Sequence, residues 1–132
     1  MKATDQRYLH KVYVAGPMSG LPEFNFPAFF LAAAKLKSAG HTVFNPAERD
    51  NDRHGVDISR GNETGDLAIA EAEHGFSLRE ALSDDLTWIC ENATAIYMLK
   101  GWEQSKGSLA ELSLAKALGL RVWHQKGAVV PS

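Results

Sequence analysis

The segment that decides the fold is KVYVAGPMSG, residues 11–20. Its first half is a run of β-favouring residues that ends at Gly16-Pro17. A short apolar run bounded by turn residues is typical of a strand that is buried on both faces of a parallel sheet. We therefore expect a strand over residues 11–15, followed by a loop that contains glycine.

Outward from this strand, helical and strand patterns alternate along the chain. Helices are predicted over residues 26–39, 67–73, 77–91 and 108–118, and strands over residues 41–44, 93–99 and 121–125. Asn25 is the expected N-cap of the first helix and Gly40 its left-handed end. This alternation indicates right-handed βαβ units. The expected fold class is α/β, with one Rossmann-like domain over residues 1–132. Its parallel sheet has four or five strands, the fifth an edge strand at Val129-Val130, and helices cover both faces.

The composition excludes several classes of protein. The 132 residues are 45% hydrophobic and 23% charged, which is typical of a globular domain and not of a disordered chain or a fibre. A net charge of −2 argues against binding to duplex nucleic acid through its phosphates. The single cysteine, Cys90, precludes an internal disulfide and is expected in the core. The five histidines lack ligand spacing, so no metal site is expected.

The sequence also predicts where the protein resides. Residues 1–11 are polar and lack the apolar core of a secretion signal. No stretch approaches the roughly 18 uninterrupted apolar residues of a membrane span. We expect a soluble, cytoplasmic protein with no membrane partner.

Two carboxylates fall where the pattern requires a hydrophobic residue. Asp85 lies on the apolar stripe of its predicted helix, between Leu82 and Ile89. Because an unpaired buried carboxylate is costly, Asp85 is either hydrogen-bonded for structural reasons or kept for chemistry. Glu111 shares a helix face with Leu114, Ala115 and Leu118. It is either a first-turn glutamate that favours the helix dipole or a functional carboxylate.

Ligands of open α/β sheets bind beyond the carboxyl ends of the strands. The loop there is formed by Gly16, Pro17, Met18, Ser19 and Gly20, which allow a ligand close to the backbone but lack the spacing of a dinucleotide or phosphate loop. Asn45 ends the second strand, and Ser105, Gly107 and Ser108 precede Glu111 with amides that suit a phosphate or a sugar hydroxyl. Tyr13 is either a core residue or the hydrogen-bond partner of a carboxylate. The polar residues 49–66 are expected to form a lid over this edge.

Together these residues resemble a known family. Tyr13, Asp85, Glu111 and the segments 12–20, 45–48, 84–88 and 101–111 are similar to the nucleoside 2-deoxyribosyltransferase superfamily, which includes 2'-deoxynucleoside 5'-phosphate N-hydrolases. The likeness is greatest to a branch that is common in bacteriophages and prophages. The resemblance implies that Glu111 is a nucleophile, that Tyr13 hydrogen-bonds it and that Asp85 handles the nucleobase proton. It also implies that Ser105 contacts a 5'-phosphate. Leu109 and Ser113 depart from small residues common in better-known members.

The function implied by the resemblance is cleavage or transfer at the N-glycosidic bond of a nucleoside or nucleoside 5'-monophosphate. Glu111 would carry a covalent glycosyl intermediate, with no metal and no cofactor. A homodimer or larger assembly is expected, because several relatives complete their cleft with a neighbouring subunit. Trp102 and Trp123, if exposed, are candidates for its interface. The alternatives are a nucleotide-binding sensor or decoy without turnover, and an N-glycosidase of a signalling dinucleotide.

Overall fold

The computed structural model of the chain describes residues 9–55, 57, 59, 62–75 and 77–130. Its strands are β1 (Lys11–Ala15), β2 (Thr42–Phe44), β3 (Ala95–Met98) and β4 (Arg121–His124). Its helices are α1 (Phe26–Ser38), α2 (Pro46–His54), α3 (Leu67–His74), α4 (Leu78–Asn92) and α5 (Lys106–Ala117). Two 3₁₀ turns, η2 (Pro22–Asn25) and η3 (Trp102–Gln104), precede α1 and α5. The alternation predicted from the sequence is confirmed.

The strands of the described residues form one parallel sheet in the order β2-β1-β3-β4. Tyr13 of β1 lies in register with Phe44 of β2 on one side and Ile96 of β3 on the other. The chain therefore leaves β1 in one direction and later returns to its other side. In open α/β sheets, such a reversal between β1 and β3 is where a ligand crevice forms.

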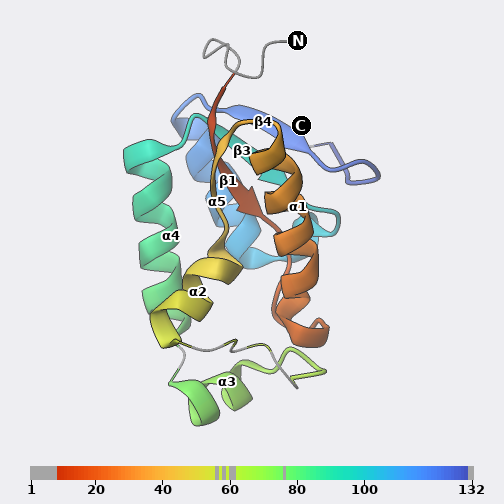
Figure 1. Cartoon of the computed structure of the whole chain (residues 1–132), viewed down its shortest axis with the longest axis vertical. Coiled ribbons are helices and arrows are strands. Elements are labelled where there is room, and N and C mark those ends of the chain that lie inside the picture. Colours follow the sequence, from red (N-terminus) through yellow and green to blue (C-terminus); the bar gives the residue numbers. More distant parts are fainter. Residues whose placement is uncertain (1–8, 56, 58, 60–61, 76, 131–132) are drawn as a thin grey trace.

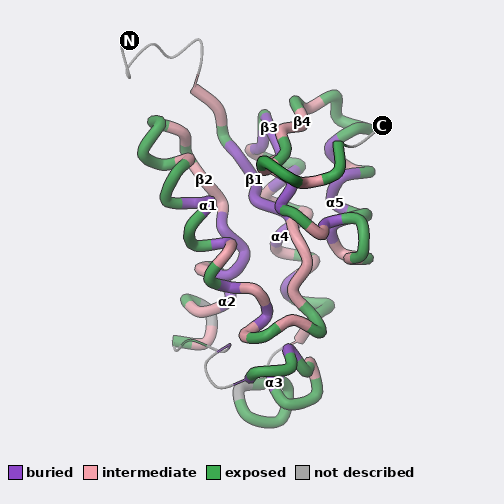
Figure 2. The backbone as a smooth tube through the Cα atoms, turned by 90° about the vertical axis from the view of Figure 1, so that its right-hand side faces the viewer, coloured by how far each residue is buried: buried purple, intermediate pink, exposed green. Residues whose placement is uncertain are grey.

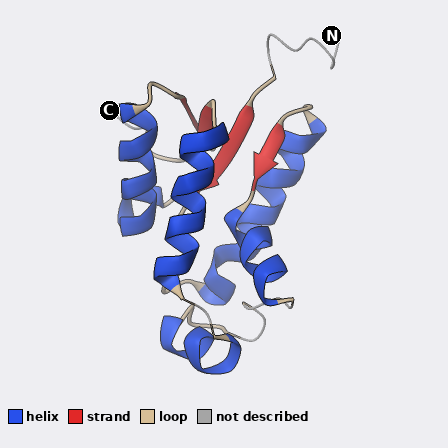
Figure 3. Cartoon of the chain, turned by 90° about the vertical axis from the view of Figure 1, so that its left-hand side faces the viewer, coloured by secondary structure: helices blue, strands red, loops and turns tan. Residues whose placement is uncertain are grey.

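Helices cover both faces of the sheet, as predicted (Figures 1 and 3). Neighbouring residues of a strand point to opposite faces. Val14 packs with Phe26 and Phe29 of α1. Tyr13 belongs to a second cluster, which includes Ile89 of α4 and Leu112 of α5. Figure 2 shows the buried backbone concentrated in β1 and β3, at the centre of the sheet. The fold is a single Rossmann-like α/β domain.

Three details of the sequence prediction are wrong, and the N-cap at Asn25 is confirmed by its position only. Val129 and Val130 are exposed and form no strand, and the carbonyl of Val129 accepts a hydrogen bond from Nε1 of Trp102 instead. Asn25 is the N-cap of α1, as predicted, but its backbone is left-handed (φ 60°) rather than extended, so its side chain makes no capping hydrogen bond; its Nδ2 donates to the carbonyl of Pro17 (3.1 Å). Cys90 is exposed, because it follows Ile89 on α4 and one helical step turns it away from the sheet. Leu118, expected on the face of Glu111, is also exposed, since α5 ends at Ala117.

The polar segment after β2 is more regular than expected. Residues 46–54 form α2, whose N-cap Asn45 accepts a hydrogen bond from the amide of Ala47 (3.0 Å). Helix α3 follows as predicted and lies at the end of the molecule toward which β1 runs (Figure 1). Residues 56, 58, 60 and 61 of the predicted lid lie outside the described residues. The first part of the segment 49–66 is therefore helical. Its function as a lid stays a prediction.

The structure tests only part of what the sequence predicts about cellular location. Among the helices that the structure describes, none combines the length and the apolar character needed to cross a bilayer. The predicted lack of a secretion signal concerns residues 1–11, of which residues 1–8 lie outside the described part of the chain. That expectation stays a prediction.

Candidate functional site

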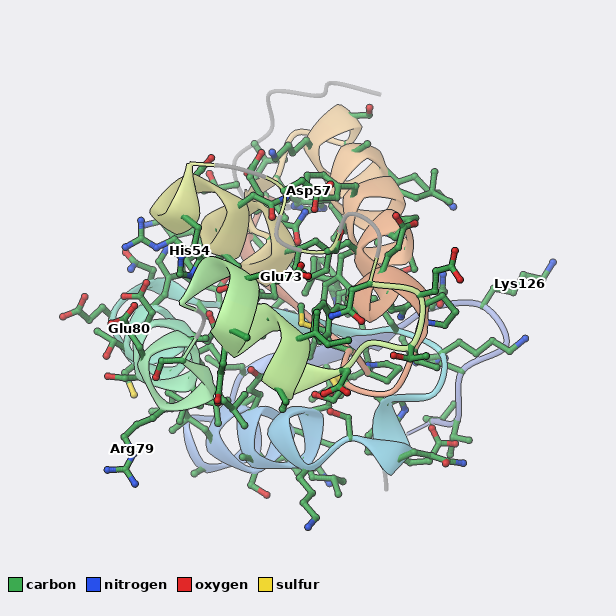
Figure 4. All side chains as sticks on the ribbon, turned by 90° about the horizontal axis from the view of Figure 1, so that it is seen from below. His54, Asp57, Glu73, Arg79, Glu80 and Lys126 are labelled. Atoms are coloured by element: carbon green, nitrogen blue, oxygen red, sulfur yellow. The ribbon has the colours of Figure 1, made fainter. Side chains whose placement is uncertain are left out.

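A pocket of about 490 Å³ lies at the carboxyl ends of β1 and β3, in the crevice that the strand order creates. It brings together Tyr13, Asp85 and Glu111, three residues from three different elements. The predicted binding residues that line the same pocket are Gly16, Pro17, Met18, Ser19, Ser105, Gly107 and Ser108. Figure 4, which views the molecule from below, shows α3 in front of this edge of the sheet and the side chains of Arg79 and Glu80 pointing outward from the start of α4.

Two predicted binding residues do not line the pocket. Gly20 has a φ of 83° and forms a turn in which its amide donates to the carbonyl of Gly65 (2.9 Å). This bond ties the loop after β1 to the segment before α3. Asn45 is buried and caps α2. The structure therefore gives both residues a local structural role, and a contact of either with a ligand stays a prediction.

Tyr13 and Glu111 form the centre of the site. The hydroxyl of Tyr13 donates to Oε2 of Glu111 over 2.7 Å, although the two residues are 98 positions apart in the chain. Glu111 is only 5% exposed, and Tyr13 is fully buried with its ring stacked on Phe44. The packing of the ring holds the hydroxyl in place, so the carboxylate of Glu111 has a defined orientation.

The surroundings of this pair change how it ionises. Burial raises the pKa of Glu111 to about 8, and the nearby Asp85 also raises it, while the hydrogen bond from Tyr13 lowers it. Burial, followed by the charges of Glu111 and Asp85, raises the pKa of Tyr13 well above its ordinary value. At neutral pH Tyr13 is therefore a neutral donor, and the raised pKa of Glu111 favours the protonated form of its carboxyl group.

Asp85 reaches the pocket from α4 and is 6% exposed. It interacts with Tyr13 as well as with Glu111, as the pKa of each shows. Its neighbour Asp84, predicted on the outer face, accepts a hydrogen bond from Nε of Arg49 (2.7 Å) and links α4 to α2. Because Asp85 raises the pKa of Glu111, the two carboxyl groups are electrostatically coupled. One proton on this pair leaves one acid and one carboxylate.

The first turn of α5 forms another side of the pocket. Ser105 is its N-cap, and its Oγ accepts a hydrogen bond from the amide of Ser108 (3.2 Å). Lys106 and Gly107 follow and also line the pocket. The amides of a helix N-terminus and a lysine ammonium both favour an anion. This side of the pocket is therefore suited to a phosphate.

Sequence reasoning missed Asp50 of α2, which is buried and lines the pocket. It lies four residues after Pro46, which also lines the pocket, so the two share a helix face. The spacing was obscured because the segment is polar and was expected to be a loop. Leu109 and Ser113, the two departures from the resembling family, are exposed and lie outside the pocket.

The remaining candidates lie elsewhere. Trp102 is buried, and its Nε1 donates to the carbonyl of Val129 (2.8 Å). Trp123 is partly buried, with its ring 5.2 Å from those of both His10 and His41. Neither tryptophan is exposed, so neither is available for the predicted interface. Within the described residues, no three histidine, cysteine, aspartate or glutamate side chains are placed to hold a metal ion.

Comparisons with known proteins identify a family and nothing more specific. No curated protein and no solved structure matches the chain significantly. A family model described as a domain of unknown function, DUF4406, matches residues 10–124. The match runs from β1 to β4 and includes Tyr13, Asp85 and Glu111. The chain belongs to the DUF4406 family.

Proposed function

We propose that the protein is an N-glycosidase or deoxyribosyltransferase that acts on a nucleoside or nucleoside 5'-monophosphate. The observation that carries the proposal is the buried Glu111, oriented by Tyr13 and coupled to Asp85 inside a pocket of about 490 Å³. This volume is within the range of small-molecule sites. Paired carboxyl groups, one an acid and one a nucleophile, are the groups that glycosidic cleavage requires.

In the first step, the Glu111 carboxylate forms a bond to the anomeric carbon of the sugar. The bond between this carbon and the base nitrogen breaks, and its electron pair leaves with the base. Asp85 donates a proton to the departing base. The negative charge of Glu111 stabilises the oxocarbenium-like transition state. This step needs Glu111 in its ionised form, and the hydrogen bond from Tyr13 favours that form because it lowers the pKa of Glu111.

In the second step, a water molecule attacks the anomeric carbon of the glycosyl-Glu111 intermediate. Asp85, now a carboxylate, accepts a proton from the water, and the carboxylate of Glu111 leaves. If a second base attacks in place of water, the same step completes a transfer. In either reaction, Asp85 acts as the acid in the first step and as the base in the second.

The phosphate of a 5'-nucleotide would lie at the first turn of α5. The amide of Ser108 donates to Oγ of Ser105, and the hydroxyl of Ser105 keeps its own hydrogen for donation to the phosphate, beside Gly107 in the same turn. The ammonium of Lys106 adds a positive charge. This arrangement favours a 5'-monophosphate over a free nucleoside.

The proposal is tested by incubating the protein with a panel of nucleosides and 5'-nucleotides and measuring the released base by chromatography. We expect release with the wild-type protein and none with Glu111→Gln, which keeps the size of the side chain but cannot act as a nucleophile. An equal rate of release in the variant would contradict the role of Glu111. Binding of a nucleotide without release by the wild-type protein would contradict catalysis and support the sensor alternative.

A further inference from the structure

The hydroxyl of Ser108 is a feature of the pocket that the proposed reaction leaves unused. Ser108 is 1% exposed and lines the pocket, and its Oγ has no hydrogen-bond partner among the described residues. The hydrogen bond between Ser108 and Ser105 uses the amide of Ser108 and leaves its hydroxyl unpaired. Since a buried hydroxyl without a partner is unfavourable, a ligand that pairs with it gains affinity.

The position of Ser108 on α5 limits which part of a ligand it can meet. Ser108 precedes Glu111 by three residues, so both side chains lie on the same face of the helix, one turn apart. It also lies between Ser105, at the phosphate end of the pocket, and Glu111, at the reacting carbon. A ligand that spans these two ends places its sugar over Ser108.

Stereochemistry identifies the sugar atom nearest to this hydroxyl. In a β-nucleoside, the base leaves from one face of the ring and the nucleophile attacks the opposite face. The 2'-hydroxyl of ribose projects from that opposite face, on the carbon next to the anomeric carbon. The 3'-hydroxyl projects from the same face but is one carbon further from the anomeric carbon, so a side chain beside the nucleophile is nearer to the 2'-hydroxyl. A 2'-deoxyribose presents only hydrogen atoms at the 2' carbon.

We propose that Ser108 binds the 2'-hydroxyl of ribose and that the pocket takes ribonucleotides in preference to 2'-deoxyribonucleotides. This inference rests on the proposed function, because it uses the face from which Glu111 attacks. It departs from the deoxyribose preference that the resembling superfamily implies. Hydrogen bonds to this hydroxyl also strengthen as positive charge develops on the ring, so the contact contributes to catalysis as well as to binding.

The experiment compares three 5'-monophosphates of the base that is released fastest: the ribonucleotide, its 2'-deoxy analogue and its 3'-deoxy analogue. With the wild-type protein, we expect kcat/KM to be about fivefold higher for the ribonucleotide than for the 2'-deoxy analogue, the value of one neutral hydrogen bond. In Ser108→Ala this ratio falls to about one. Ser113→Ala, an exposed serine on the same helix, is the matched control and keeps the wild-type ratio. A wild-type ratio that Ser108→Ala leaves unchanged, or a loss seen only with the 3'-deoxy analogue, overturns the inference.

A binding measurement separates this inference from the proposed function. If no base is released from any substrate, the proposed function fails, and the thermal shift given by ribose 5-phosphate and by 2-deoxyribose 5-phosphate then tests Ser108 alone. The inference predicts a larger shift with ribose 5-phosphate in the wild-type protein and equal shifts in Ser108→Ala. Equal shifts in the wild-type protein overturn it. Without ligand, Ser108→Ala is expected to melt at or slightly above the wild-type temperature, since it removes a buried hydroxyl without a partner.

Discussion

At the scale of single residues, Glu111 lowers the stability of the fold at alkaline pH. Its pKa in the folded protein is about 8, whereas a glutamate in an unfolded chain has a pKa of about 4.3. Between these two pH values, the folded state keeps a proton that the unfolded state has lost. The free energy of unfolding therefore falls as pH rises from about 4.3 to about 8. A site that needs an ionised carboxylate at this position is costly to the fold.

The variant Glu111→Gln is expected to melt at a higher temperature than the wild-type protein at pH 8.5, and the difference is expected to shrink at about pH 5, because glutamine does not titrate. Thermal denaturation followed by circular dichroism at both pH values measures this. Glu103→Gln, at an exposed glutamate outside the pocket, is the control and should show no such dependence. A difference between Glu111→Gln and wild type that is the same at both pH values would contradict the raised pKa of Glu111.

The variant Tyr13→Phe is expected to shift the rising limb of the pH–rate profile to higher pH. The hydrogen bond from Tyr13 lowers the pKa of Glu111, so its removal makes Glu111 ionise later. We also expect kcat at neutral pH to fall by about tenfold or more, since the carboxylate loses its orientation. Steady-state rates from pH 5 to pH 10 test this. The control is Tyr97→Phe, at a tyrosine outside the pocket, and an unmoved profile in Tyr13→Phe would refute the coupling.

At the scale of elements, helix termini account for much of the site. The N-cap of α2 keeps Pro46 and Asp50 in place along the pocket, and the N-cap of α5 orients the amides near Gly107. Both caps use a side-chain oxygen that accepts from the first turn. In this fold, short polar side chains at the carboxyl edge of the sheet therefore support the helices and shape the pocket at the same time.

Replacement of Asn45 by alanine is expected to lower the free energy of unfolding by about 1 kcal/mol, the usual loss for an N-cap. Urea denaturation measures this value. Asn45→Ser keeps an acceptor oxygen for the amide of Ala47 without placing a charge at this buried position, and should lose less. If both variants lose the same stability, the capping bond is not what stabilises α2.

Ser105→Ala is expected to weaken the use of a nucleoside 5'-monophosphate more than the use of the free nucleoside. Removal of the hydroxyl takes a donor from the phosphate, while the loss of the cap affects both substrates equally. The measured quantity is the ratio of kcat/KM for the two substrates. An unchanged ratio would count against a phosphate at the start of α5.

At the scale of the whole molecule, the described surface includes apolar residues that the domain itself does not cover. Phe30 and Leu31 lie next to each other on the outer side of α1, and Leu31 is 64% exposed. Neighbouring exposed apolar residues are common where two chains associate. They replace Trp102 and Trp123 as candidates, since neither tryptophan is exposed.

We expect the protein to form a homodimer or a larger assembly in solution. Light scattering over a concentration series should give at least twice the 14.4 kDa mass of one chain. Leu31→Lys should shift the mass toward that of one chain if the α1 surface is the interface. A mass of 14.4 kDa for the wild-type protein at every concentration would show a monomer.

The sequence by itself determined the α/β class, the parallel sheet and the two carboxylates on apolar helix faces. These features are local, because the spacing of residues within one strand or helix already shows which face is buried. Asp85 and Glu111 were found in this way, and both are buried in the pocket. The helix at 46–54 was missed because its residues are almost all polar, and it packs on the domain through only a few buried residues, such as Ala47 and Asp50.

Only the tertiary structure decided how these residues act together. Tyr13 and Glu111 meet because β1 and α5 pack on each other, and no local pattern encodes a contact across 98 residues. The pKa of Glu111, the burial of Asp50 and the unpaired hydroxyl of Ser108 likewise depend on which elements surround each side chain. Burial and electrostatic coupling are properties of the packed chain. Local spacing identifies the chemical groups, and packing alone sets their distances, their protons and their partners.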